Sequence, residues 1–243
     1  MENPVIDPNN QYTRMQQDQY DRDAAHWSVD NRDPVVGSFD QHNAWQDYDD
    51  FLFKGVSSMA GKTALEFGCG PGRNMVRFNG RFRQIDGVDI SEGNLKNAEI
   101  WCRQNGVERM PALFKNNGVD ISAVDDAAYD VVFSTICMQH IPVYDVRFGL
   151  LKEFYRVLKT GGQLCFQMGF DNWVRKGFSA YHANTLEAHG TNGIHDVCIT
   201  DVDQVRQDLE KIGFTGFDHD MRPVGPGDQH HNWLFVRATK PAA

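Results

Sequence analysis

The chain has 243 residues, a length that suits one α/β domain with an appended segment. Its formal net charge of −9 disfavours a nucleic-acid partner, because a phosphate-binding face must be basic. No apolar run approaches the length of a membrane span and no charged-then-apolar leader opens the sequence, so we expect a cytoplasmic protein without a membrane partner. The cysteines, at positions 69, 102, 137, 165 and 198, lack metal-ligand spacing and are expected to be reduced thiols.

Residues 1–59 form a polar, partly acidic segment with scattered aromatic side chains. Ser38-Phe39-Asp40-Gln41 has the form of a capping box and predicts a helix that reaches about Met59. Tyr20 and Trp27 have two interpretations: they pack this segment onto a sheet, or they belong to a lid over a ligand, where an aromatic face would attract a cation. We therefore treat residues 1–59 as a candidate helical lid.

A glycine-rich turn lies at residues 62–72, KTALEFGCGPG. A short apolar run precedes it, and its alternate glycines let a ligand approach the backbone closely. A helix-compatible stretch follows, which is how an open α/β sheet builds a cofactor site at the carboxyl end of a strand. Arg73 stands where the dinucleotide fingerprint needs its third glycine, and no Gly-Lys-Ser/Thr follows. The turn therefore fits neither an NAD-binding fingerprint nor a P-loop.

A second strand is predicted at residues 84–90, QIDGVDI. It ends near the carboxylate of Asp89, which at that place can accept both hydroxyls of an adenosyl ribose. The alternative is that Asp89 binds no ligand and only stabilises the N-terminus of the next helix through the helix dipole. Ser91 is better placed than Asp89 to cap that helix. A central parallel strand is predicted at residues 129–135, followed by Met-Gln-His-Ile-Pro at 138–142.

These motifs, in this order and spacing, resemble those of class I S-adenosylmethionine-dependent methyltransferases of the small-molecule, type 11-like kind. The resemblance covers about residues 60–165. It implies an α/β fold with a Rossmann-like, doubly wound, seven-stranded sheet of order 3-2-1-4-5-7-6 and a C-terminal antiparallel hairpin. It also implies a domain over residues 60–243 that uses S-adenosylmethionine and releases S-adenosylhomocysteine.

The resemblance implies cofactor contacts from three segments. Arg73 reaches the methionine carboxylate or is a surface residue, and Asp120 accepts from the adenine amino group or only forms a turn. The full set of expected cofactor-binding residues is Glu66, Gly68, Cys69, Gly70, Arg73, Asp89, Ile90, Val119, Asp120 and Ser134.

The second half of the chain continues the α/β pattern. Apolar residues at helical spacing over 143–158 predict a helix that Gly161-Gly162 ends, and a fifth strand is expected at 163–168. Residues 169–199 lack periodicity and are predicted to be a substrate insert. A last helix from about residue 200 to 213 and a hairpin of strands at 214–221 and 232–238 complete the fold. The expected substrate-binding residues are Tyr20, Trp27, Trp173, Tyr181 and His182.

Methyl transfer mainly requires that the protein align the acceptor nucleophile with the S–CH3 bond, because the sulfonium already makes the methyl group electrophilic. A general base is needed only for a protonated or alcoholic acceptor. His140, just past the fourth strand, is the candidate base, although the same position is often structural in the family; His182 and His195 are weaker candidates. Asp228, His230 and His231 resemble a metal triad, but their loop position and missing fourth ligand favour no metal.

The expected function is methyl transfer to an oxygen or nitrogen of a small-molecule metabolite by a monomer or homodimer. Ser134-Thr135-Ile136-Cys137 occupies the place where amino-methylating DNA enzymes carry Asn/Asp-Pro-Pro-aromatic. Two alternatives stay open at this point: a protein or nucleic-acid methyltransferase, and a non-catalytic partner subunit that binds S-adenosylmethionine.

Overall fold

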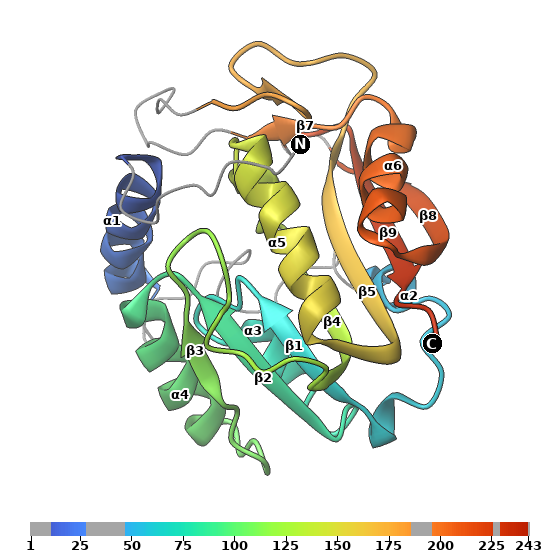
Figure 1. Cartoon of the computed structure of the whole chain (residues 1–243). Helices are drawn as coiled ribbons and strands as arrows, with labels where there is room; N and C mark the ends of the chain where they lie inside the picture. The colour runs from blue at the N-terminus through green and yellow to red at the C-terminus, as the bar shows by residue number, and fades with distance from the viewer. Residues whose placement is uncertain (1–10, 28–46, 186–195, 226–228, 243) are drawn as a thin grey trace.

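A seven-stranded sheet of order β3-β2-β1-β4-β5-β9-β8 runs through the computed structural model, which describes residues 11–27, 47–185, 196–225 and 229–242 (Figure 1). The first five strands are parallel neighbours, and β9 pairs antiparallel with both β5 and β8. The predicted sheet order and C-terminal hairpin are thus confirmed, with β8 and β9 as the sixth and seventh strands. The strands are β1 (Thr63–Phe67), β2 (Gln84–Asp89), β3 (Leu113–Lys115), β4 (Tyr129–Ser134), β5 (Leu158–Phe170), β8 (Thr215–Pro223) and β9 (Asn232–Thr239).

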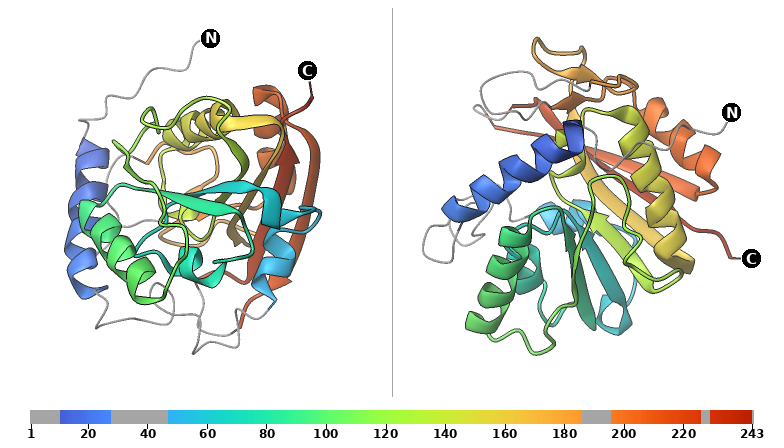
Figure 2. Two further views of the ribbon diagram at one scale, coloured as in Figure 1. Left: turned by 90° about the horizontal axis from the view of Figure 1, so that it is seen from below. Right: turned by 60° about the vertical axis from the view of Figure 1, so that its left-hand side comes forward.

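Helices cover both faces of this sheet (Figures 1 and 2). Successive strand residues point to opposite faces, so Leu164 and Phe166 pack with α5 and α6 while Cys165 between them packs toward α2, α3 and α4. Each face therefore buries its own apolar cluster. The helices are α1 (Gln11–His26), α2 (Tyr48–Leu52), α3 (Arg73–Arg77), α4 (Glu92–Gln104), α5 (Tyr144–Val157) and α6 (Val202–Ile212), with short 3-10 turns at Met59–Gly61 and Met138–His140.

Two short parallel strands, β6 (Ser179–Ala180) and β7 (Val197–Cys198), form a separate small sheet. A parallel bridge between Phe170 and Ile199 joins it to the end of β5. The polypeptide between β5 and α6, predicted as an unpatterned insert, thus carries a little strand structure and lies beyond the carboxyl end of β5. We refer to its described residues, 171–185 and 196–198, as the cap.

The helix ends follow local chemistry that the sequence predicts. Ser91 caps α4, because its hydroxyl accepts from the Asn94 amide at 3.2 Å. Asp201 caps α6 by accepting from the Asp203 amide at 2.9 Å, and Gly213 ends that helix with φ of 115°.

Two predicted helix boundaries are wrong. Helix α5 ends at Val157 rather than at the glycine pair, since Leu158 is already extended and begins β5. Gly161, with φ of 78°, instead sits in an irregularity of β5 opposite β4. The helix predicted to reach Met59 ends at Leu52; its capping box at residues 38–41 lies outside the described residues.

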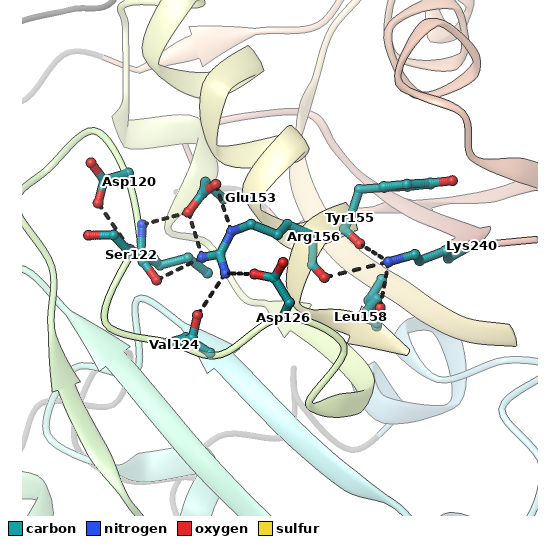
Figure 3. Close-up of polar contacts among 10 residues, drawn as sticks. Asp120, Ser122, Val124, Asp126, Glu153, Tyr155, Arg156, Leu158 and Lys240 are labelled. Carbon is teal, nitrogen blue, oxygen red and sulfur yellow. Dashed lines mark hydrogen bonds and ion pairs between the residues drawn. The ribbon is translucent and has the colours of Figure 1, made fainter. Parts of the chain in front are cut away.

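A cationic side chain fastens the loop between β3 and β4 to α5 (Figure 3). The Arg156 guanidinium donates to the carbonyl oxygens of Val124 at 2.8 Å and Ile121 at 3.1 Å, and it pairs with Asp126 and Glu153. Beside it, the Lys240 ammonium donates to carbonyls at the end of α5, including those of Tyr155 and Leu158 at 2.8 Å each (Figure 3). None of the described helices is both long and apolar enough to cross a membrane.

Candidate active site

A cavity of about 260 Å³ opens at the carboxyl ends of β1, β2 and β4, below α1. This is the edge at which parallel α/β sheets bind ligands, because the loops after the strands meet there. The lining residues from the sheet side are Glu66, Phe67, Gly68, Cys69, Gly70, Pro71, Arg73, Asn74, Asp89, Ile90, Asn94, Asn116, Gly118, Thr135, Ile136, Cys137, His140 and Ile141; those from α1 and the residue after it are Tyr12, Gln16, Tyr20, Asp23 and Trp27.

The glycine turn after β1 forms one wall of this cavity. Gly68 has φ of 72°, and a Cβ built there would lie 2.3 Å from the Cys137 sulfur, so backbone conformation and packing both require glycine. Gly70 also adopts a positive φ, of 52°. The turn therefore lies close against the loop after β4, and its backbone faces the cavity.

Asp89 links this turn to the second strand. One of its carboxylate oxygens accepts from the Gly70 amide at 2.8 Å, and the other accepts from the Ser91 amide at 2.9 Å. Burial raises the pKa of Asp89 in spite of these hydrogen bonds. A carboxylate oxygen can accept more than one hydrogen bond, so Asp89 keeps capacity for a ligand hydroxyl.

Several buried oxygen atoms in this wall have no hydrogen-bond partner among the residues that the structure describes. They are Glu66 Oε2, Asn74 Oδ1, Asn94 Oδ1 and Asn116 Oδ1, and all four residues line the cavity. Buried polar atoms are normally hydrogen-bonded, so such a cluster indicates a ligand that supplies several donors. Burial also raises the pKa of Glu66 to about 8, although its other oxygen accepts from Asn74 Nδ2 at 2.5 Å. An adenosyl group with its hydroxyls and a methionine ammonium fits this demand for donors.

Helix α1 contributes side chains to the cavity lining. It lies against α4 (Figure 2). Ser91 Oγ donates to Asp21 at 2.6 Å, and Asn97 Nδ2 donates to the Ala24 carbonyl at 2.8 Å. The two helices come so close that a Cβ at Gly93 would lie 2.7 Å from the Ala24 methyl. Tyr20 and Trp27 both line the cavity from this side, with ring centroids 6.4 Å apart.

His140 lies between this cavity and a second one of about 490 Å³ on the cap side. Its Nδ1 is 2.5 Å from a carboxylate oxygen of Asp196. Burial favours a higher pKa for Asp196, but the charges and hydrogen bonds of His140 and His230 outweigh burial and hold the pKa well below its usual range. The second cavity is lined by His140, Arg175, Lys176, Gly177, Phe178, Asp196 and Gln229.

Six of the predicted site residues line neither cavity. Ser134 is fully buried and donates to the Phe67 carbonyl at 2.9 Å, while Val119 packs against the core. Asp120 accepts hydrogen bonds from Asn117 and Ser122 in its own loop, which lowers its pKa against the effect of burial.

The other three come from the cap. Tyr181 is buried and donates to Asp208 at 3.0 Å, His182 is exposed beside the Tyr144 ring, and Trp173 is 57% exposed beside the His231 ring. His195 and Asp228 lie outside the described residues.

Sequence reasoning missed several residues that line the cavities. Asn116 directly follows β3 and Thr135 directly follows β4, so their positions at strand ends were a signal that could have indicated them. Tyr12 and Gln16 precede the aromatic pair on one helix. Asp196 carries no local signal, because only the tertiary fold brings it to His140, 56 residues away in the chain.

Residues 65–166 match the model of the family described as a methyltransferase domain. The chain is also similar to two curated relatives named ubiquinone biosynthesis O-methyltransferase. The one from Idiomarina loihiensis is 28% identical over 119 residues, which are 48% of this chain and 46% of that protein. The one from Burkholderia vietnamiensis is 25% identical over 146 residues, 57% of each. The chain thus matches about half the length of these relatives.

Solved structures show the same fold at low sequence identity. The [4+2]-cyclase SpnF has a TM-score of 0.68 and 16% identity, covering 99% of this chain and 98% of that one. Phosphoethanolamine N-methyltransferase 2 of Haemonchus contortus, in complex with S-adenosyl-L-methionine, has a TM-score of 0.61 and 17% identity, covering 81% of this chain and 53% of that one. At these low identities, the structures show only that the fold is shared.

The sheet order and the cavity at the carboxyl ends of its strands define a Rossmann-like α/β fold with a ligand site at the edge where such folds bind ligands. More particularly, residues 65–166, somewhat less than half of the chain, are similar to methyltransferase domains, as the sequence motifs indicated.

Proposed function

We propose that this protein transfers a methyl group from S-adenosylmethionine to an oxygen or nitrogen atom of a small-molecule acceptor, with His140 as general base. The observation that carries the proposal is the position of His140. It lines both the cavity that fits S-adenosylmethionine and the second cavity, in which we place the acceptor. A base at the boundary of two cavities can reach the proton of a nucleophile that faces the methyl donor.

The Asp196 carboxylate orients this base. If His140 donates Nδ1–H to Asp196, the other ring nitrogen is left as the proton acceptor, and the carboxylate stabilises the imidazolium that forms. When bound, S-adenosylmethionine supplies an electrophilic methyl group on its sulfonium. The chain's own residues then align the acceptor, exclude water and remove its proton. An oxygen acceptor benefits most, because a neutral hydroxyl is a weak nucleophile.

The lining of the second cavity supports a small acceptor with an anionic or phenolic group. Arg175 and Lys176 provide positive charge there, and Phe178 provides an aromatic face that also stacks near the Arg175 guanidinium at 5.7 Å. The relatives named O-methyltransferases agree with an oxygen acceptor of small size.

The test is a turnover screen with S-adenosylmethionine against phenols, hydroxy acids, carboxylates and amines, repeated with His140→Ala. We expect His140→Ala to lower kcat by about 10²–10⁴-fold, the usual contribution of a general base, with little change in the dissociation constant for S-adenosylmethionine. The matched control is His182→Ala, since His182 is exposed and lines neither cavity.

Two results would contradict this proposal. One is equal turnover in the wild-type and His140→Ala proteins, which would remove His140 from the mechanism. The other is tight binding of S-adenosylmethionine with no methyl transfer to any acceptor class, which would favour a non-catalytic or different activity on the same fold.

A further inference from the structure

A cluster of three potential metal ligands lies behind His140, between the cap and the sheet. Asp171 directly follows β5, Cys198 ends β7, and His230 lies two residues before β9. All three residues are buried, with Asp171 and Cys198 at 0% exposure and His230 at 2%. Their ligand atoms lie within 4.8 Å of one another. The cluster thus joins three separate segments through carboxylate, thiol and imidazole groups.

The two distances from Asp171 match the edges of a zinc tetrahedron. Asp171 Oδ2 lies 3.4 Å from His230 Nδ1 and 3.6 Å from Cys198 Sγ. Zinc bond lengths of about 2.0 Å to oxygen and nitrogen and about 2.3 Å to sulfur give tetrahedral edges of about 3.3 Å and 3.5 Å.

Neighbouring groups orient two of the three ligands, His230 and Asp171, as they do around established zinc sites. His230 Nε2 lies 3.3 Å from Asp196 Oδ2, so a carboxylate orients the imidazole. Asp171 Oδ1 accepts from the His231 amide at 2.9 Å, which leaves Oδ2 for the cluster. The imidazole of His230 packs directly on β5, because a Cβ at Gly169 would lie 2.1 Å from it.

The charges of the cluster also favour a cation. Two carboxylates, those of Asp171 and Asp196, flank the buried His230 ring. On metal binding the Cys198 thiol loses its proton to solvent, and the thiolate forms a bond to the ion. The Trp173 carbonyl oxygen, 3.5 Å from Cys198 Sγ, is a candidate for the fourth ligand.

We propose that Asp171, Cys198 and His230 bind a zinc ion that fastens the cap to β5 and β9. Mixed carboxylate, thiolate and imidazole ligands in a tetrahedron select zinc among the common divalent ions. The proposal departs from the expectation of no metal, which considered only ligands close together in the sequence. Through Asp196, which touches both His230 and His140, the ion also positions the general base; this last part rests on the proposed function.

The direct test is the metal content of the full-length protein purified from zinc-supplemented medium. We expect about one zinc per chain in the wild type, and a loss of more than tenfold in zinc affinity for Cys198→Ala and His230→Gln. Cys165→Ala is the matched control, because Cys165 is equally buried but lies in β5 outside the cluster. Retention of zinc by the control together with its loss from the cluster variants supports the site.

Cobalt replacement tests the same site even where a variant fails to fold. The metal-free wild type titrated with cobalt should show the visible absorption of a tetrahedral site and a near-ultraviolet sulfur-to-cobalt band. A wild-type protein that retains no zinc and gives no such spectrum overturns the proposal, as does equal metal loss from Cys165→Ala.

A kinetic readout separates the positioning effect from the metal site itself. Removal of zinc by a chelator should lower kcat and shift the pH profile of kcat, while the dissociation constant for S-adenosylmethionine stays the same. If the zinc-bound and chelator-treated proteins had the same pH profile of kcat, the metal site would stand, but the ion would not position His140. Failure of every acceptor to be methylated would overturn the proposed function, whereas the metal content and the cobalt spectrum would still decide the metal site.

Discussion

The Asp89 carboxylate connects the loop after β1 to the helix after β2. Its oxygens accept backbone hydrogen bonds from Gly70 and Ser91, so the residue fixes the glycine turn and also faces the cavity. A neighbouring carboxylate on the same strand, Asp86, is similarly buried but accepts from the Tyr129 hydroxyl and the Ala112 amide and lines neither of the two cavities described above. This pair makes it possible to separate ligand binding from stability.

We expect Asp89→Ala to weaken S-adenosylmethionine binding by about 1–3 kcal/mol, because hydrogen bonds to a charged group are of that size. Asp86→Ala should lower the free energy of unfolding and leave the affinity nearly unchanged. Isothermal titration calorimetry and denaturant unfolding of both variants measure the two effects. Unchanged affinity in Asp89→Ala would contradict the assignment of the ribose to this carboxylate.

Glu66 makes the stability of the ligand-free protein depend on pH. Burial raises its pKa from 4.5 to about 8 in the folded state. Between these values the folded protein holds a proton that the unfolded chain has released, so the free energy of unfolding falls with rising pH, by at most about 1.4 kcal/mol per pH unit. Protonated Glu66 makes its full contribution to the free energy of unfolding below the pKa of 4.5 that it has in the unfolded chain. This contribution falls as the pH rises and is lost above about pH 8.

Glu66→Gln should remove this part of the pH dependence. We therefore expect the melting temperature of the variant to rise relative to that of the wild type as the pH increases from about 6 to about 9. Thermal unfolding of both ligand-free proteins across this range measures the difference. Parallel curves would show that the carboxylate is already ionised near neutral pH. A cationic ligand group beside Glu66 would instead favour the ionised form, so S-adenosylmethionine should reduce the wild-type dependence.

At the scale of elements, the loop between β3 and β4 is held by Arg156 as well as by its own hydrogen bonds. This loop contains Asn116 and Gly118, which line the cavity, and the guanidinium holds its later carbonyls against α5 (Figure 3). Arg206 on α6 pairs only with exposed carboxylates three and four residues away on the same helix, so it serves as a matched control.

Arg156→Leu should lower the free energy of unfolding by about 2–3 kcal/mol, because it leaves buried carbonyls and charged partners without their donor. Arg206→Leu should cost less than about 0.5 kcal/mol, as exposed helical ion pairs usually do. Guanidinium-induced unfolding measures both changes. Equal losses in the two variants would mean that the contacts of Arg156 add nothing beyond a surface ion pair.

The strands were predictable because their signals are local. An apolar run followed by glycines identifies β1, one that ends at a carboxylate identifies β2, and a near-continuous apolar run identifies β4, all without tertiary information. The glycine pair at 161–162 misled the prediction, because a left-handed glycine fits a helix end and a strand irregularity equally well. Here the sheet pairing with β4 decided the outcome, and pairing between distant strands cannot be read from one segment.

At the scale of the whole molecule, the candidate site combines segments that the sequence keeps far apart. The position of the glycine turn and of Asp89 at the cavity was predictable, since both lie at strand ends that meet at one edge of the sheet. The meeting of Asp196 with His140, and of Cys198 with His230, depends on how the cap folds back over that edge. The sequence predicted an insert there, but its lack of periodicity gave no register from which to place individual side chains.

We propose that ligand entry requires movement of α1. The helix contributes residues to the cavity lining and contacts α4, with hydrogen bonds from Ser91 to Asp21 and from Asn97 to the Ala24 carbonyl. A ligand that contacts such a helix in the closed state makes its opening rarer.

We therefore expect S-adenosylhomocysteine to slow amide hydrogen exchange in α1 by about tenfold or more at saturation, which corresponds to at least about 1.4 kcal/mol of added protection. Exchange in α6 is the internal control, because α6 packs on α5 and β8 and contributes no residue to the cavity. Mass spectrometry of peptides from both helices, with and without ligand, gives the comparison. Protection confined to the glycine turn, with α1 exchanging as in the free protein, would show that the helix is not a lid and that the ligand enters past it.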